Sequence, residues 1–365
     1  MKFAIFLQHY FPYGGLQRDA VRLAQAAVDE GDSPHLVVST WNGPKPEGFD
    51  ITELNSGGQS NHRKSANFAH DCQELLKSGD FDKSICFSRV PGSDFQFCGD
   101  PCFADRFKRT KPNILRWLPR YKYLLEQEAA IFGETSLTHL FFLAESEIPA
   151  YKNHYNISSS KVTVLPPWLK KPAVFDSAST VIKQEVLESL KLPPESELLL
   201  FVGSDFQRKG LDRAIKALAH IQKKNFHLLV CGQSKPDTFE AISRKLEISE
   251  QVHFLGPRDD IPRLMTASTL LIHPARQETA GMVLLEALTY GLPVLCTENC
   301  GYSTHVHEAG CNLLTSNPST EEISKALLSS LPQLQNLQHK TLTWSNVSER
   351  YKTAKLLLQT MRNSI

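Results

Sequence analysis

The sequence lacks a run of about 18 consecutive apolar residues, so nothing in it predicts a helix that crosses a membrane. It has almost no excess of either charge, and a formal net charge of +1 indicates no acidic partner for the protein as a whole. It contains neither an internal repeat of about 20 to 50 residues nor a low-complexity tract, which excludes a repeat architecture. The opening MKFAIFLQHYFPYGG has one lysine and a short apolar run, which is typical of a first β-strand rather than of a secretion signal.

The eight cysteines form no C-x-x-C pair. Cys98 and Cys102, and likewise Cys296 and Cys300, are spaced C-x3-C, but no histidine pair with zinc-finger spacing accompanies them. We interpret the cysteines as reduced thiols of a cytoplasmic protein and expect no metal site.

Short apolar runs alternate with helical patterns along the chain. In the first part we predict strands at 3–7, 36–39, 84–88, 140–144 and 161–165, helices at 16–30 and 65–77, and a long loop at 42–64. In the second part we predict strands at 198–203, 226–232, 252–256, 270–274 and 293–297. Continuous apolar strands separated by helices predict an α/β protein with parallel sheets covered on both faces.

The polar, proline-containing stretch 166–197 separates the two series of strands. A chain of 365 residues is too long for one ordinary core. We therefore predict two Rossmann-like domains facing across a cleft at the carboxyl ends of their strands. The domains are expected to comprise residues 1–165 plus 346–365, and residues 166–345. A predicted helix at 345–360 would return the chain to the first domain.

The stretch ETAGMVLLEA, residues 278–287, holds two glutamates eight residues apart. The pattern predicts a helix at 280–290, with Glu278 in the loop before it and Glu286 about two turns inside it. Unpaired first-turn amides and the helix dipole make an anion site between the two carboxylates. This order matches the sugar hydroxyls, diphosphate and ribose diol of a nucleotide sugar. A helix-start charge and a solvated glutamate are the alternative explanation.

Two more segments place glycine and charge at the ends of strands. In VGSDFQRKGLDRAIKAL, residues 202–218, a strand ends at Gly203 and the cations Arg208 and Lys209 precede a helix, which suits a diphosphate leaving group. In FPYGGLQRD, residues 11–19, a Gly-Gly pair lets the backbone come close to a ligand. An ordinary surface loop and a first-turn charge at Asp19 are the alternatives.

Together these segments resemble the retaining glycosyltransferases of the GT-B fold with an E-x7-E motif (family 4), and among them the lipopolysaccharide core glucosyltransferases. The resemblance runs the length of the chain. Its segments are YFPYGGLQRD (10–19), NH (61–62), the region of Asp100, VLPP (164–167), VGSDFQRKG (202–210), VHFLG (252–256) and LLIHPARQETAGMVLLEALTYGLPVLCTENCGY (270–302). The E-x7-E motif marks the larger family, whereas FPYGGLQRD and GSDFQRKG are more specific.

The resemblance implies a role for each matching residue. Glu278 would hold the hydroxyls of the donor sugar, and Glu286 the ribose. Arg208 and Lys209 would neutralise the departing β-phosphate. The remaining residues expected in the nucleotide-sugar site are Gly14, Gly15, Gly203, Arg258, Gly281, Met282 and Val283. Asp19 and Asp100 would face the acceptor or the transferred sugar, although CGDPCF departs from the family pattern and a turn aspartate is the alternative for Asp100.

The resemblance also implies a reaction. A hexose, glucose first, would pass from a UDP-sugar to a heptose of the lipopolysaccharide inner core, in α-linkage, with no metal ion and no cofactor beyond the donor. Front-face attack would retain the configuration, and a covalent carboxylate at Asp100 is the alternative. The residues leave open a donor such as UDP-galactose or a UDP-N-acetylhexosamine, a nucleotide-sugar epimerase, and a membrane-docking protein with a decayed site.

Residues 103–123 read FADRFKRTKPNILRWLPRYKY, with seven Lys and Arg against one acid and interleaved aromatic side chains. This composition is typical of a segment that binds an anionic membrane surface. A helix face that packs its aromatic residues inward is the alternative, and we expect no nucleic-acid partner. The resemblance agrees with the first interpretation and implies a peripheral protein on the inner face of the bacterial inner membrane.

Overall fold

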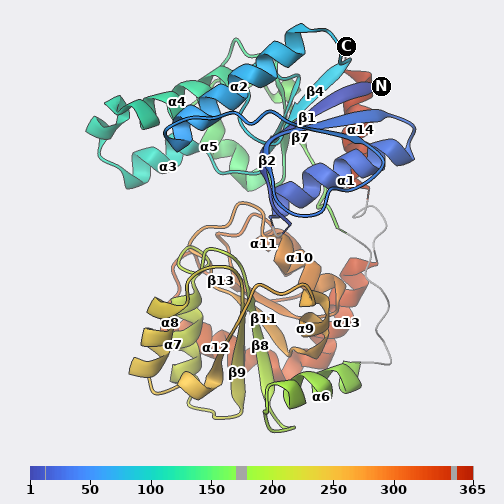
Figure 1. Cartoon of the computed structure of the whole chain (residues 1–365). Helices are drawn as coiled ribbons and strands as arrows, with labels where there is room; N and C mark the ends of the chain where they lie inside the picture. Colours follow the sequence, from blue (N-terminus) through green and yellow to red (C-terminus); the bar gives the residue numbers. More distant parts are fainter. Residues whose placement is uncertain (13, 170–178, 347–351, 365) are drawn as a thin grey trace. The chain divides into compact units, whose positions relative to one another are not determined.

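The computed structural model describes residues 1–12, 14–169, 179–346 and 352–364. The chain divides into two compact units, residues 1–168 with 352–365, and residues 169–351 (Figure 1). The sequence-based boundaries were 165/166 and 345/346. Residues 170–178 of the predicted linker at 166–197 lie outside the described residues. Residues 347–351 of the predicted helix at 345–360 also lie outside them.

The first unit is built on a seven-stranded parallel sheet in the order β3-β2-β1-β4-β5-β6-β7. Its strands are β1 (Lys2–Tyr10), β2 (Ser33–Trp41), β3 (Asp50–Glu53), β4 (Lys83–Cys86), β5 (Phe95–Cys98), β6 (His139–Phe142) and β7 (Val162–Val164). Its helices are α1 (Gly15–Asp29), α2 (Asn61–Lys77), α3 (Phe103–Thr110), α4 (Pro119–Phe132), α5 (Ile148–Lys152) and α14 (Thr353–Asn363). Short 3-10 turns cover Asn113–Trp117, Glu145–Glu147 and Ser159–Lys161.

The second unit is built on a six-stranded parallel sheet in the order β10-β9-β8-β11-β12-β13. Its strands are β8 (Glu197–Val202), β9 (Phe226–Cys231), β10 (Val252–Gly256), β11 (Leu270–His273), β12 (Val294–Thr297) and β13 (Leu313–Leu314). Its helices are α6 (Ser179–Ser189), α7 (Leu211–Ile221), α8 (Asp237–Lys245), α9 (Ile261–Ala267), α10 (Met282–Thr289), α11 (Ser303–Glu308), α12 (Thr320–Ser330) and α13 (Leu334–Ser345). The 3-10 turns are Ser249–Gln251 and Leu331–Gln333.

Strands β8, β9, β11 and β12 of the second unit are buried along nearly all of their length, which explains their continuous apolar sequence. Every residue of β9 and β11 is buried, as expected for parallel strands between two helix layers. Figure 1 shows α7, α8 and α12 on one face of this sheet and α6, α9 and α13 on the other. The prediction of two parallel α/β domains is confirmed.

Helix α14 packs on the first unit beside α1, so the prediction that the chain end returns there is confirmed (Figure 1). The Arg362 guanidinium donates to Glu30 at 2.7 Å and to Asp32 at 2.6 Å. At the other end of α14, the Thr353 hydroxyl donates to the carbonyl oxygens of Pro166 and Pro167.

Several element predictions were wrong. The supposed loop 42–64 contains strand β3, and helix α2 begins inside it at Asn61. Strands β5 and β13, of four and two residues, were missed. Of the helix predicted at 345–360, Ser345 is the last residue of α13 and residues 353–360 belong to α14, whereas residues 347–351 lie outside the described residues.

Candidate active site

The strand order of the second sheet reverses between β8 and β11. These two strands are hydrogen-bonded neighbours, with Leu270 beside Leu199 and Leu271 beside Leu200, although two strands separate them along the chain. Open α/β sheets bind ligands at such a reversal, outside the carboxyl ends of the strands. The loops after β8 and β11 contain Arg208, Lys209 and Glu278, so the sequence-predicted charges gather at this point.

The loop after β8 is fixed by close backbone contacts. A Cβ on Gly203 would lie 2.2 Å from Lys209 Cδ, so the absence of a side chain at Gly203 makes room for that lysine. Gly210 has φ +80°, and a Cβ there would lie 2.1 Å from the Pro274 carbonyl oxygen. The Arg276 amide donates to the Arg208 carbonyl at 2.8 Å. The loops after β8 and β11 are therefore packed backbone to backbone.

Glu278 lies in an extended segment that is held by the loop after β12. Its amide donates to the Asn299 carbonyl at 3.2 Å, and its carbonyl accepts from the Gly301 amide at 2.9 Å. This ladder forms a parallel bridge between Glu278 and Cys300. The carboxylate is consequently aimed by backbone rather than by a flexible loop.

Three nitrogen atoms surround Glu278 Oε2. Lys209 Nζ lies 2.7 Å away, and Arg208 Nη1 and His273 Nε2 each lie 3.6 Å away. Among the described residues, Oε2 has no aligned hydrogen-bond donor, so the close lysine contact is an ion pair rather than a directed hydrogen bond. Arg208 is additionally oriented by Asp205 Oδ2 at 3.2 Å and by the Gln277 carbonyl at 2.7 Å.

This arrangement keeps Glu278 ionised. Burial alone would raise the pKa of its carboxyl, but His273, Lys209 and Arg208 together hold that pKa well below the ordinary glutamate range. Burial lowers the pKa of His273, and the facing Glu278 offsets this only in part. One oxygen of an ionised carboxylate is thus surrounded by a neutral imidazole and two cations.

Helix α10 begins immediately after this cluster. Gly281, with φ +88°, is its N-cap, and Met282 is its first residue. The predicted start at residue 280 was therefore wrong by two residues. Amides at the start of a helix have no partner within it, so those of Gly281, Met282 and Val283 lie where an anion would be bound. Glu286 is half-buried in the second turn of α10.

Arg258 follows β10 at the same edge of the sheet. Its guanidinium forks onto Asp260, with Nε to Oδ1 at 2.7 Å and Nη2 to Oδ2 at 2.6 Å. This pair raises the pKa of Arg258 and lowers that of Asp260. Because the side chain of Arg258 is already paired with Asp260, the backbone of its loop is the part that could contact a nucleobase.

The predicted residues of the first unit lie after β1 and β5. Gly14 caps α1, and a Cβ on it would overlap the Gln17 side chain, whereas a Cβ on Gly15 would meet no atom within 4 Å. Asp19 is buried and pairs with Arg22 at 3.3 Å. Asp100 is exposed, and its carbonyl accepts from the Tyr151 hydroxyl at 2.9 Å.

His273 was not predicted as a site residue from the sequence. It reads as the last residue of an apolar strand, LLIH, and the only signal was a polar residue at the carboxyl end of that run. All eight cysteines are buried and free of disulfides.

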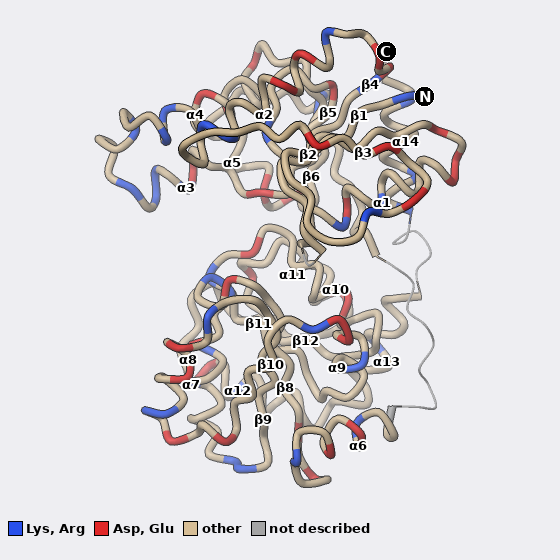
Figure 2. Tube along the Cα trace, viewed as in Figure 1, with Lys and Arg blue, Asp and Glu red and all other residues tan. Residues whose placement is uncertain are grey.

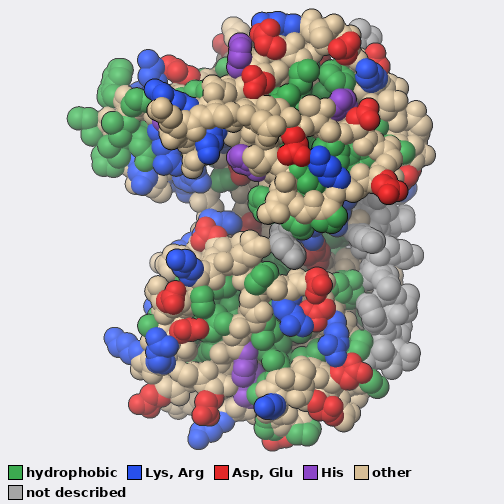
Figure 3. Space-filling model, viewed as in Figure 1, with side chains coloured by type: hydrophobic (Ala, Val, Ile, Leu, Met, Phe, Trp, Pro, Cys, Tyr) green, Lys and Arg blue, Asp and Glu red, His purple; other side chains and the backbone are tan. Residues whose placement is uncertain are grey.

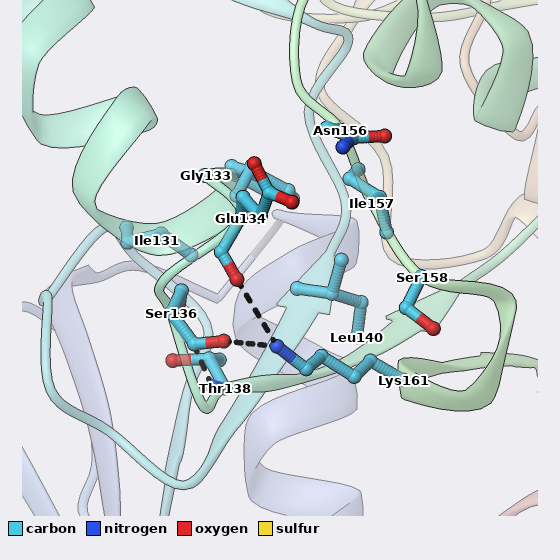
Figure 4. A pocket seen from close by; sticks show the side chains of 11 residues that line it. Ile131, Gly133, Glu134, Ser136, Thr138, Leu140, Asn156, Ile157, Ser158 and Lys161 are labelled. Atoms are coloured by element: carbon cyan, nitrogen blue, oxygen red, sulfur yellow. Dashed lines mark hydrogen bonds between the residues drawn. The ribbon is translucent and has the colours of Figure 1, made fainter.

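A separate pocket lies in the first unit. It measures about 170 Å³ and lies next to the amino end of β6. Figure 4 shows the ammonium group of Lys161 turned toward the backbone carbonyls of Glu134 and Ser136. A pocket at the amino ends of strands, with its cation already bound to carbonyls, offers no convergent chemistry.

Residues 103–123 form α3, a 3-10 turn and the start of α4. Phe103 and Phe107 are buried, whereas Ile114 and Trp117 are three-quarters exposed. Lys and Arg follow the trace through this segment (Figure 2), and its apolar side chains gather beside them on the surface (Figure 3). Within the described residues, no helix has both the length and the apolar character that crossing a membrane requires.

Comparison with known proteins assigns the family. The model described as "Glycosyl transferases group 1" matches residues 182–341. The chain is 35% identical to the lipopolysaccharide glucosyltransferase WaaG of Escherichia coli (strain K12) over 334 residues, which cover 90% of this chain and 89% of that protein. The chain belongs to the group 1 glycosyltransferases, and it is a glycosyltransferase with two parallel-sheet domains of the GT-B type.

Solved structures agree with this assignment. The crystal structure of WaaG, a glycosyltransferase involved in lipopolysaccharide biosynthesis, matches with a TM-score of 0.92 and 32% identity, over 99% of this chain and 100% of that one. The Anabaena protein HepE, solved in complex with UDP and glucose, matches with a TM-score of 0.79 and 15% identity, over 100% of both chains. At that identity the second match shows the fold alone.

Proposed function

We propose that this glycosyltransferase moves glucose from UDP-glucose to a heptose of the lipopolysaccharide inner core, in α-linkage, with retention and without a metal ion. The observation that carries the proposal is the Glu278 carboxylate, held 2.7 Å from Lys209 at the head of α10. The similarity to a lipopolysaccharide glucosyltransferase over 90% of the chain supports glucose and the lipid-linked acceptor.

The chemistry follows from charge. Cleavage of the bond between the anomeric carbon and the β-phosphate oxygen leaves positive charge on the sugar and negative charge on the diphosphate. Arg208, Lys209 and the amides at the start of α10 are preorganised to stabilise the second charge. Two cations at this position would supply the neutralisation for which other transferases use a metal ion.

Glu278 would accept hydrogen bonds from the sugar hydroxyls through its ionised carboxylate. Glu286 would hold the ribose diol, and the loop of Arg258 the uracil. The acceptor hydroxyl attacks the face that the diphosphate leaves, and the departing phosphate takes its proton. Gly15, where a Cβ would meet no atom within 4 Å, would let the backbone approach the donor phosphates. Asp19 and Asp100 would face the acceptor or the transferred sugar.

The segment 103–123 would bring the enzyme to its acceptor. An anionic surface attracts its exposed cations, and Ile114, Trp117 and Leu118 supply an apolar tip beside them. The protein would then bind peripherally to the inner face of the bacterial inner membrane.

The first test is thermal stability in the presence of UDP, GDP, ADP, UDP-glucose, UDP-galactose, UDP-GlcNAc and UDP-GalNAc, with EDTA throughout. A ligand that binds only the folded state raises its stability by RT ln(1 + [L]/Kd). Stabilisation by UDP and UDP-glucose despite EDTA supports the proposal. Stabilisation by another UDP-sugar names a different donor, and no response to any uridine ligand overturns the assignment of the site.

Product analysis separates transfer from the rival reaction. Release of UDP that depends on a heptose-containing acceptor indicates a transferase. Conversion of a UDP-sugar to its epimer without an acceptor would instead identify an epimerase of the same fold.

A further inference from the structure

His273 is a buried polar residue without a hydrogen-bond partner among the described residues. Its side chain is 0% exposed, and neither ring nitrogen has a hydrogen bond within that part of the chain. The ring stacks on Phe201, with centroids 5.9 Å apart and planes at 21°. A leucine or phenylalanine would fill the same space at the end of β11 without burying two polar atoms, so packing alone gives no reason for a histidine.

The group that His273 Nε2 faces is Glu278 Oε2, at 3.6 Å. That distance is too long for a hydrogen bond, which joins such atoms at about 2.7 to 3.2 Å. The gap exists while Lys209 Nζ occupies the near position, 2.7 Å from the same oxygen. A shortening of the distance between His273 Nε2 and Glu278 Oε2 would therefore allow a hydrogen bond between them.

Lys209 has two competing partners once a donor is bound. The proposed function assigns it to the β-phosphate, whereas the structure shows it on Glu278. A lysine that turns to the phosphate leaves a carboxylate of 11% exposure without its closest cation. A buried charge that loses its partner needs another donor to keep its ionisation and direction.

We propose that His273 is a positioning residue, which donates a hydrogen bond from Nε2 to Glu278 and keeps that carboxylate aimed at the sugar when the diphosphate draws Lys209 away. This inference rests on the proposed function of the site. It assigns His273 no contact with the donor, since its ring is fully buried.

The exchange has an electrostatic signature. The charged groups that face His273 are Glu278, from the loop after β11, and Lys209 and Arg208, from the loop after β8. Burial lowers the pKa of His273, the two cations lower it further, and Glu278 raises it. Movement of Lys209 toward an anionic diphosphate removes one lowering charge, so the pKa of His273 rises and the protein takes up protons as the ligand binds.

The test uses two substitutions that differ in a single property. His273→Phe keeps a flat ring that can stack on Phe201 but has no donor. His273→Gln keeps a side-chain N–H near the position of Nε2. We expect His273→Phe to lower kcat/KM for UDP-glucose by about 30-fold while the Kd for UDP changes by less than about threefold, because UDP lacks the transferred hexose that Glu278 would hold. His273→Gln is expected to recover activity to within about fivefold of the wild type.

Proton uptake gives an independent readout. Calorimetric titration of UDP into the wild type, at about pH 6 in two buffers of different ionisation enthalpy, should show net uptake that His273→Gln abolishes. This measurement decides the matter even if His273→Phe fails to fold. Unchanged uptake in His273→Gln overturns the proposal.

Two kinetic results also overturn it: His273→Phe within twofold of the wild type, or equal losses in both variants, since either indicates a residue that only packs. Failure of the proposed function is distinguishable, because the wild type itself would then neither bind UDP nor transfer glucose.

Discussion

The side chain of Lys209 runs across the Cα of Gly203, so that a Cβ on the glycine would lie 2.2 Å from Lys209 Cδ and 2.8 Å from Cε. The side chain of Lys209 therefore fills the space that a side chain at position 203 would occupy. The position of the ammonium group beside Glu278 depends on the missing side chain. The two residues are six positions apart, and their contact arises from the turn between them.

Gly203→Ala is expected to lower kcat/KM by about 100-fold while leaving the fold intact, because the end of a lysine side chain can swing away from the new methyl group. Steady-state kinetics and thermal unfolding measure the two effects separately. Gly57→Ala is the matched control, since a Cβ there meets nothing within 4 Å. Wild-type turnover in Gly203→Ala would contradict the role assigned to Lys209.

This contact shows what the sequence could and could not predict. Buried parallel strands have continuous apolar sequences, so β8, β9 and β11 could be predicted. The charged residues that follow them, Arg208, Lys209 and Glu278, were expected to lie near a bound nucleotide sugar. The reason for Gly203 was not visible, because steric overlap with Lys209 depends on a loop conformation. His273 was missed for a similar reason: whether a histidine in an apolar run is packed or facing a carboxylate depends on atoms five residues away in the chain.

Glu278→Gln is expected to lower the rate of transfer by about 100-fold or more without unfolding the protein. The amide keeps the shape of the side chain but cannot accept from the sugar hydroxyls as an anion, and it loses its attraction to Lys209. Glu240→Gln, which disrupts a surface contact with Arg244 at 3.8 Å, should leave activity unchanged. Lys209→Ala is expected to match Glu278→Gln in activity, and near-normal turnover in either variant would show that the site lies elsewhere.

Simultaneous replacement of Arg116, Arg120 and Lys122 by Ser is expected to weaken binding to anionic vesicles by about 100-fold at low salt, at about 1 kcal/mol per cation. Hydrolysis of the donor should be unaffected, because these residues lie in a different unit from Glu278. Sedimentation with vesicles that contain phosphatidylglycerol measures the effect. The control replaces Lys224, Lys245 and Lys325, three cations of the second unit; if both triple variants bind equally well, the segment is not a membrane anchor.

The same segment depends on a buried carboxylate. Glu128 is 0% exposed and accepts from the amides of Phe103 and Ala104 at 2.7 and 2.8 Å, while Arg89 pairs with it at 2.8 Å. Glu128→Gln leaves the Arg89 charge uncompensated and is expected to lower the free energy of unfolding by about 3 to 5 kcal/mol. Chemical denaturation measures the loss. Glu126→Gln, two residues away on the same helix and exposed, should cause no measurable change.

A final prediction concerns the pH dependence of stability. His227 and His253, on neighbouring strands β9 and β10, share a hydrogen bond at 3.1 Å between Nδ1 and Nε2. Burial lowers the pKa of both, and in His253 the charge of His227 lowers it further. The folded protein therefore binds protons less readily than the unfolded chain, whose histidines titrate near pH 6.5.

Stability contributed by the pair is complete above about pH 6.5 and is lost as the pH falls through the lowered folded pKa values. Urea unfolding between about pH 7.5 and 5 should show this decline. His253→Gln keeps a polar side chain but removes one titrating ring, and its stability should fall less steeply over the same interval. Equal slopes for the wild type and His253→Gln would mean that the acid sensitivity arises from other histidines whose pKa is lowered by burial, such as His35, His139 and His273.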